Sequence, residues 1–334
     1  MGEKLVTRLS LIIFLFAISV FVISLSLKPK IIEIQGRAQV SKVPENFSKE
    51  ISLILVGDIM LDRRVKITMI KNGDWKFPFL KIADDFKNAD ILVGNLEGPI
   101  SDKGKKVGSI YSFRNDPKAI EGLIYAGFDV ISFANNHAFD YGREAFEDCL
   151  TRLSNSEISY VGAGFNEKEA FSLIIKEING AKIGFLAYTN LGPESWKATE
   201  SNSGIAWISE KDFEKIRKII ENAKSQVDVL IVSLHSGEEY QKTPTQFQID
   251  FSRMVIDTGA DIVIGHHPHV IQPNKKYGNG YIFYSLGNFV FDQSFSKETM
   301  EGQILKVLIE NNKIKEVIPI NIKINEFFQP EIKK

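Results

Sequence analysis

The chain has little cysteine, little histidine and almost no net charge. Cys149 is the only cysteine among 334 residues, so an intramolecular disulfide is excluded and cysteine usage gives no clue to the compartment. The formal charge is −1 at pH 7, which gives no sign of a nucleic-acid-binding surface. The sequence also has no repeat of fixed period and no low-complexity tract. These absences indicate an ordinary globular protein with no expected nucleic-acid partner.

Polar residues are scarce near the start of the chain. Lys4 and Arg8 precede an apolar run from Leu9 to Leu27 that only serines interrupt. Its length approaches the roughly 20 residues that cross a bilayer as a helix. We therefore expect residues 1–30 to form an uncleaved, single-pass anchor in the cell membrane, residues 31–49 to be a linker, and the main domain to be extracytoplasmic. A cleavable signal peptide, which shares the basic start, is the alternative.

A repeating pattern begins at about residue 50. Short apolar, β-branched runs recur, each of strand length and most without polar alternation, as expected of strands buried on both faces. The runs are ISLILVG, ADILVGN, DVISFAN, KIGFLAY, VDVLIVSLH, ADIVIGH and YIFYSLGN. Helical patterns lie between several of them, at residues 117–127, 143–156, 209–226 and 245–260. This alternation predicts one α/β domain over residues 50–325.

Polar side chains follow these runs. They are Asp58, Asn95, Glu97, Asn136, His137, His235, His266, His267, His269 and Asn288. Residues that follow buried parallel strands lie at one edge of an α/β sheet, where ligands usually bind. All five histidines belong to this set. The sequence therefore predicts that its histidines gather at one edge of the fold.

Imidazole, carboxylate and amide groups together favour a site for divalent metal ions. Ligand sets of nitrogen and oxygen without thiolate suit Mn, Fe or Zn. His267 and His269 can enter one site only where the backbone turns between them, and Pro268 favours such a turn. Two ions a few ångströms apart can bridge a phosphate, and a carboxylate such as Glu97 between them would offset their repulsion.

Two further residues have alternative interpretations. Asp140 lies three residues beyond His137 and either orients that imidazole or caps the helix that follows. Arg63 lies near Asp58 in the sequence and either clamps an anionic substrate or is solvated on the surface. We treat the first interpretation of each as the hypothesis to be tested.

Six ordered motifs resemble those of a known family. The stretches GDIMLDRR, ADILVGNLEGPIS, FANNHAFDYG, LHSGEEY, GADIVIGHHPH and YSLGNFVFD, within residues 51–293, look like the CapA-type capsule synthesis proteins, also called the poly-γ-glutamate biosynthesis family. That family is similar to the calcineurin-like metallophosphoesterases. The resemblance implies a four-layer α/β/β/α metallophosphoesterase-like sandwich with a two-metal site at its sheet edge, here preceded by the N-terminal transmembrane helix.

The resemblance also implies roles for individual residues. His137 would be the general acid or a donor to the transition state. The implied metal ligands are Asp58, Glu97, Asn136, His235, His267 and His269. The chain departs from the superfamily pattern at residue 60, where Met60 stands in place of the histidine of a D-x-H motif. It also has Ser236 where many family members carry tryptophan.

The expected function is to act on an anionic cell-envelope polymer, in the synthesis, export or attachment of poly-γ-glutamate. One alternative is a metal-dependent phosphoesterase, and so a hydrolase, of a phosphorylated envelope substrate. Another is a non-catalytic polymer-binding subunit of a membrane synthase, whose other subunits would be partners. Whether the protein is an enzyme stays open at this point, because Met60 removes one ligand of a complete hydrolase site.

Overall fold

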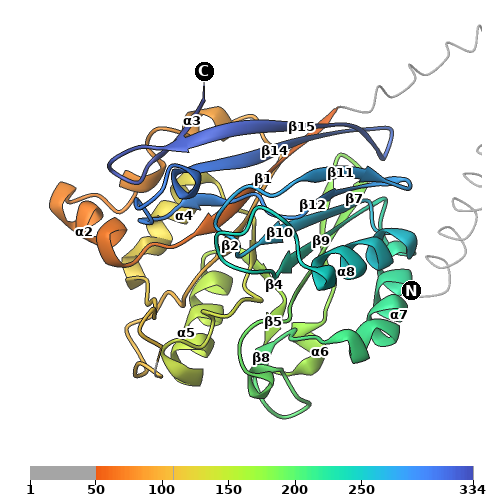
Figure 1. Cartoon of the computed structure of the whole chain (residues 1–334), viewed down its shortest axis with the longest axis horizontal. Helices are drawn as coiled ribbons and strands as arrows, with labels where there is room; N and C mark the ends of the chain where they lie inside the picture. Colours follow the sequence, from red (N-terminus) through yellow and green to blue (C-terminus); the bar gives the residue numbers. More distant parts are fainter. Residues whose placement is uncertain (1–49, 108, 334) are drawn as a thin grey trace, which may run out of the picture. The chain divides into compact units, whose positions relative to one another are not determined.

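The computed structural model describes residues 50–107 and 109–333 (Figure 1). The expected anchor at residues 1–30 and linker at residues 31–49 lie outside these ranges and remain expectations. Within the described ranges, no helix is long and apolar enough to cross a membrane.

The larger sheet has the strand order β16-β15-β14-β1-β2-β3-β4, with β13 also paired to β1. Its strands are β1 (Ile51–Ile59), β2 (Ile91–Leu96), β3 (Val130–Ser132), β4 (Ser159–Val161), β13 (Asn288–Val290), β14 (Glu301–Glu310), β15 (Lys313–Ile324) and β16 (Pro330–Ile332). Strands β1 to β4 run parallel, whereas β14 to β16 are antiparallel. The parallel half therefore presents its carboxyl ends at one edge.

The second sheet has the order β11-β12-β10-β9-β7-β6. Its strands are β6 (Ile174–Ile178), β7 (Ala181–Thr189), β9 (Val229–His235), β10 (Ile262–His266), β11 (Asn274–Tyr277) and β12 (Gly280–Phe283). The four central strands are parallel, and β6 and β11 add antiparallel edges. A two-stranded sheet of β5 (Ala163–Gly164) and β8 (Gly204–Ile205) lies apart from both.

Helices cover the outer faces of the two sheets (Figure 1). The α-helices are α2 (Arg63–Asn72), α3 (Ala83–Phe86), α4 (Ile120–Ala126), α5 (Gly142–Asn155), α6 (Glu167–Ala170), α7 (Phe213–Lys224) and α8 (Gln246–Asp257). Short 3₁₀ turns are η1 (Phe77–Phe79), η2 (Pro117–Ala119), η3 (Glu194–Trp196), η4 (Glu210–Asp212) and η5 (Glu298–Met300). All four predicted helices are present within a few residues of their expected bounds.

Three apolar clusters define the layers. One joins the larger sheet to α2, α4 and α5, and a second joins the other sheet to α7 and α8. The third lies between the sheets, where Leu55 of β1 and Ile231 of β9 are almost wholly buried. The order is thus helices, sheet, sheet, helices, which agrees with the layering that the resemblance implied. Each central strand has an apolar layer on both faces, which explains why the runs lack polar alternation.

Candidate metal centre

Register brings the polar strand ends together. Asp58 of β1 is the Cα partner of Asn95 on β2 and of Asn288 on β13. In the other sheet, His266 at the end of β10 is the partner of His235 at the end of β9. Residues that are far apart in sequence therefore meet at one edge because their strands are parallel and end at the same level.

Two carboxylates are fully buried at this edge, but their surroundings differ. Asp58 accepts hydrogen bonds from Asn95 Nδ2 at 2.8 Å and from the backbone N–H of His267 at 3.1 Å. Both oxygens of Glu97 are buried without a hydrogen-bond partner among residues 50–107 and 109–333, and His137 Nε2 is 3.8 Å from Oε2.

The pKa values of the two carboxyl groups move in opposite directions. Burial works to raise the pKa of Asp58, but hydrogen bonding and charge from His266, with a further contribution from His269, hold it below its ordinary value. The pKa of Glu97 is raised well above its ordinary value by burial, and the negative charge of Asp58 adds to the effect. Without a cation, Glu97 is therefore an unfavourable place for a negative charge.

His267 and His269 lie on a tight turn. Their φ angles are 97° and 58°, in the left-handed region that residues with a side chain rarely adopt. The turn is held in part by a hydrogen bond from the Tyr240 N–H to Pro268 O at 2.8 Å. Backbone strain of this kind tends to occur at functional sites, where the surrounding structure enforces it. The turn between the two histidines that the sequence predicted is therefore present.

Burial keeps the imidazoles of His235 and His267 neutral. Burial lowers the pKa of His267 to about 3, and the neighbouring His269 adds to the effect. Burial also lowers the pKa of His235 well below its usual value, as do the nearby His267 and His266. A neutral imidazole nitrogen carries the lone pair that a metal ion requires.

His235 lies between two amide side chains. Its Nε2 is 2.8 Å from Asn136 Oδ1, and its Nδ1 is 3.2 Å from Asn95 Nδ2. Asn95 Nδ2 also donates to Asp58. This amide therefore links Asp58 of the larger sheet to His235 of the second sheet. The contact with Asn136 brings together two residues that were each predicted to be metal ligands.

The donor set fits a divalent cation. Two groups each bring three ligand atoms within 4.8 Å of one another: Asp58, Glu97 and His235, and Glu239, His267 and His269. The buried, unpartnered oxygens of Glu97 are the observation that tests the fit, because a cation would satisfy both. Met60 contributes nothing here, since its side chain belongs to the apolar cluster under the helices.

His137 is oriented by a carboxylate. Its Nδ1 is 2.7 Å from Asp140 Oδ2, which also accepts the Phe113 N–H at 2.8 Å. The Phe113 ring lies against the imidazole, with centroids 4.2 Å apart. Asp140 does not cap α5, whose first residue is Gly142. The structure therefore favours the orienting interpretation of Asp140.

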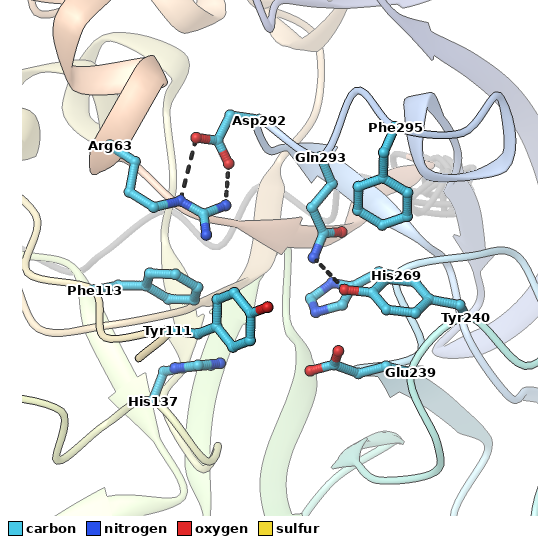
Figure 2. A pocket seen from close by; sticks show the side chains of 10 residues that line it. All are labelled: Arg63, Tyr111, Phe113, His137, Glu239, Tyr240, His269, Asp292, Gln293 and Phe295. Carbon is cyan, nitrogen blue, oxygen red and sulfur yellow. Dashed lines mark hydrogen bonds and ion pairs between the residues drawn. The ribbon is translucent and has the colours of Figure 1, made fainter. Parts of the chain in front are cut away.

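A cavity of about 370 Å³ opens beside these groups. Figure 2 shows Arg63, Phe113 and His137 on one side of it, and Glu239, Tyr240 and His269 on the other. The Arg63 guanidinium is paired with Asp292 and lies over the Phe113 ring, 4.8 Å from its centroid. Arg63 is thus a fixed donor at the cavity wall.

Comparison with known proteins identifies the family. The family model described as "Bacterial capsule synthesis protein PGA_cap" matches residues 52–293. The chain belongs to this family. "Capsule biosynthesis protein CapA" of Bacillus anthracis is 31% identical over 86% of this chain and 72% of that protein. "PGA biosynthesis protein CapA" of Bacillus subtilis (strain 168) is 33% identical over 86% of this chain and 76% of that protein.

A solved structure supports the fold of this PGA_cap chain. The crystal structure of a hypothetical protein from Thermus thermophilus aligns with a TM-score of 0.51 and 15% sequence identity, over 82% of this chain and 99% of that chain. At this identity the likeness shows the fold alone. The family model and the two Bacillus relatives, rather than this structure, confirm the expected resemblance to capsule synthesis proteins at the level of the family.

The structure of the PGA_cap chain gathers every predicted site residue around one centre. Other residues also shape this centre. Asn95 and Asn288 were predicted to lie at the sheet edge, whereas the sequence predicted no role for Phe113, Glu239, Tyr240 or Asp292. Asn288 Oδ1, for example, is 3.0 Å from His269 Nδ1. Most of these residues lie within the quoted motifs, but only the folded chain shows which atoms they face.

Proposed function

We propose that this protein is a membrane-anchored capsule-synthesis protein that acts on an anionic envelope polymer at a metal centre on the sheet edge. Membership of the bacterial capsule synthesis family supports the polymer context, and one relative is described as a PGA biosynthesis protein. The observation that carries the metal centre is Glu97, whose two fully buried oxygens lack hydrogen-bond partners beside a converging set of ligands.

The centre would hold two divalent ions, of Mn, Fe or Zn. The ligands are the predicted six, namely Asp58, Glu97, Asn136, His235, His267 and His269. When bound, such ions supply Lewis acidity and make water acidic enough to be a nucleophile at neutral pH. The neutral imidazoles of His235 and His267 favour metal binding, because neither must first give up a proton, whereas the buried Glu97 carboxyl group, whose pKa is raised, must do so.

His137 would act as the general acid. Asp140 fixes the Nδ1 side of the imidazole, which leaves Nε2 to face the centre on the Glu97 side. Nε2 would give a proton to the oxygen or nitrogen that leaves the substrate, or take one from an attacking group. Phe113 holds the ring against rotation, since it packs on its face.

Arg63 would bind a negatively charged group of the substrate. Its Nε and one terminal nitrogen donate to Asp292, so the guanidinium is fixed in place before the substrate arrives. A pre-oriented guanidinium loses little side-chain entropy on binding a carboxylate or a phosphate. The aromatic Tyr111 and Tyr240 complete a cavity suited to a chain of repeating anionic units.

The His137–Asp140 pair also favours a second function, a metal-dependent phosphoesterase of an envelope substrate. An oriented imidazole beside a metal centre can protonate a leaving alcohol as readily as an amine. A non-catalytic subunit would not need this arrangement.

The test compares the manganese-loaded full-length protein with His137→Ala. Poly-γ-glutamate and a chromogenic phosphodiester are supplied in turn, with chain length and phenolate release as readouts. We expect His137→Ala to lose about 10²- to 10⁴-fold in turnover on one substrate while its manganese content stays at the parent level. The substrate that the protein converts shows which of the two functions it has. An unchanged rate in the variant would overturn the role of His137, and polymer retention without turnover would indicate a binding subunit.

The anchor is tested separately, by N-terminal sequencing of the protein extracted from membranes. An intact start supports the single-pass anchor with the main domain outside the membrane. A mature start near residue 28 would instead show a cleaved signal peptide. Co-purification of membrane synthase subunits with the intact protein would support their role as partners.

A further inference from the structure

One metal position at the proposed centre lacks a ligand. In the D-x-H pattern that this chain resembles, the histidine two residues after the aspartate binds metal, and here that position is Met60. Met60 is fully buried in the apolar cluster between the sheet and the helices. Its thioether therefore offers no donor at the sheet edge, and a protein donor for that position would come from another part of the chain.

Glu239 offers a carboxylate beside the histidine pair. Its carboxylate and the ring nitrogens of His267 and His269 offer three ligand atoms within 4.8 Å of one another. His267 is 7% exposed, and within the described part of the chain its buried Nδ1 has no hydrogen-bond partner. A strained turn thus presents two histidines toward the carboxylate, and at least one polar atom there is unsatisfied within the protein.

The loop that carries Glu239 is fixed to the histidine turn. Gly237 has a φ of 114°, and Tyr240 has a φ of 64°, so the chain bends sharply on both sides of Glu239. The Tyr240 N–H donates to Pro268 O at 2.8 Å, between the two histidines. The side chain of Tyr240 also accepts a hydrogen bond from Gln293 Nε2 at 3.2 Å. These contacts hold Glu239 beside His269, as Figure 2 shows.

We propose that Glu239 is a metal ligand of this centre and supplies the donor that Met60 does not. This inference rests on the proposed metal centre. The ion would be bound by Glu239 together with the histidine pair, at the wall of the cavity rather than beneath it.

The charges around the cavity also favour metal binding by Glu239. It lines the same cavity as Arg63 and His137, where the substrate of a capsule-synthesis protein would carry negative charge. A free carboxylate there would repel the substrate. Coordination to a divalent ion reverses the local sign of charge, so the same residue would then contribute to a site that attracts anions.

The test is a manganese titration of the metal-free, full-length protein. Calorimetry and the electron paramagnetic resonance signal of free Mn²⁺ measure the binding. The variants are Glu239→Gln, with Glu238→Gln as the matched control. Glu238 is the adjacent exposed carboxylate and belongs to neither ligand group. We expect Glu239→Gln to lower the affinity for one equivalent of Mn²⁺ by about tenfold or more. Glu238→Gln should bind Mn²⁺ as the parent does.

Asp58→Asn separates this inference from the proposed function. If Asp58→Asn loses an ion while Glu239→Gln titrates like the parent, the centre exists and only the role of Glu239 is overturned. If the parent binds no Mn²⁺, both proposals fall. Equal weakening by Glu238→Gln and Glu239→Gln would also overturn the ligand role, because it would indicate a general effect of charge. Thermal unfolding of each metal-free variant checks that it is folded.

Discussion

The layer between the two sheets and the edge where their strands end are buried to a similar degree, yet they are built in opposite ways. Leu55 and Ile231, between the sheets, are 0% and 1% exposed and are stabilised by packing alone. Glu97 and His235, at the edge, are both 0% exposed. Glu97 has no hydrogen-bond partner, and both residues have pKa values shifted against their charged forms. Burial stabilises the first region, whereas in the second it carries the cost of removing polar groups from water.

This difference indicates that the layer between the sheets, rather than the sheet edge, stabilises the fold. A strand can continue from an apolar layer into a polar edge within a few residues, as β1 does between Leu55 and Asp58. The folding free energy from the apolar layers then offsets the cost of the strained turn and the unpartnered carboxylate.

Truncation in the layer between the sheets should have the largest effect on stability. Leu55→Ala removes a fully buried side chain, so we expect a loss of about 2–5 kcal/mol in the free energy of unfolding. The number of Mn²⁺ ions bound by the folded variant should not change, because Leu55 touches no ligand. Urea unfolding and elemental analysis measure the two quantities. A lost ion would show that the two regions are not independent.

Acid should destabilise the metal-free protein through its neutral histidines. The folded-state pKa values of His235 and His267 lie below the ordinary value of 6.5. Their contribution to stability is therefore present above pH 6.5 and is lost as pH falls below it, by up to about 1.4 kcal/mol per pH unit for each histidine. Urea unfolding between pH 7.5 and pH 5 measures the slope. We expect a smaller slope in His267→Ala, and equal slopes would contradict the assignment.

Glu97→Gln should stabilise the metal-free protein and weaken metal binding. The raised pKa of Glu97 means that the parent loses stability as pH rises above about 4.5, the ordinary value for this group. The variant avoids this loss, so its advantage should grow with pH and reach on the order of 1–3 kcal/mol. Thermal unfolding with and without Mn²⁺ is the measurement. A variant that is less stable than the parent at neutral pH would show that Glu97 has a partner in solution.

Phe113→Leu should have the smallest effect. The ring packs on His137 and on the Arg63 guanidinium, and such contacts contribute about 0.5–1.5 kcal/mol. We expect a decrease in turnover of less than about tenfold, with unchanged metal content. A loss as large as that of His137→Ala would mean that Phe113 does more than hold the imidazole.

Much of the fold could be predicted from local sequence patterns. The apolar runs form β1, β2, β3, β7, β9 and β10, and the last run forms β12 and leads into β13. The long hairpin of β14 and β15 was not predicted, although Asn311 and Asn312 at its turn have positive φ, as the favoured hairpin turns require. β16 also extends the sheet past residue 325, the predicted end of the domain.

The sequence by itself determined the α/β class, the sheet edge and the residue types that gather there, because strand length and periodicity are properties of neighbouring residues. Only the tertiary structure decided which atoms meet. The backbone N–H of His267 reaches Asp58 across 209 positions of sequence, and no local pattern encodes that contact. Glu238 and Glu239 are chemically identical neighbours in SGEEY. The turn between Gly237 and Tyr240 brings Glu239 to the histidine pair, because the fold fixes those backbone angles.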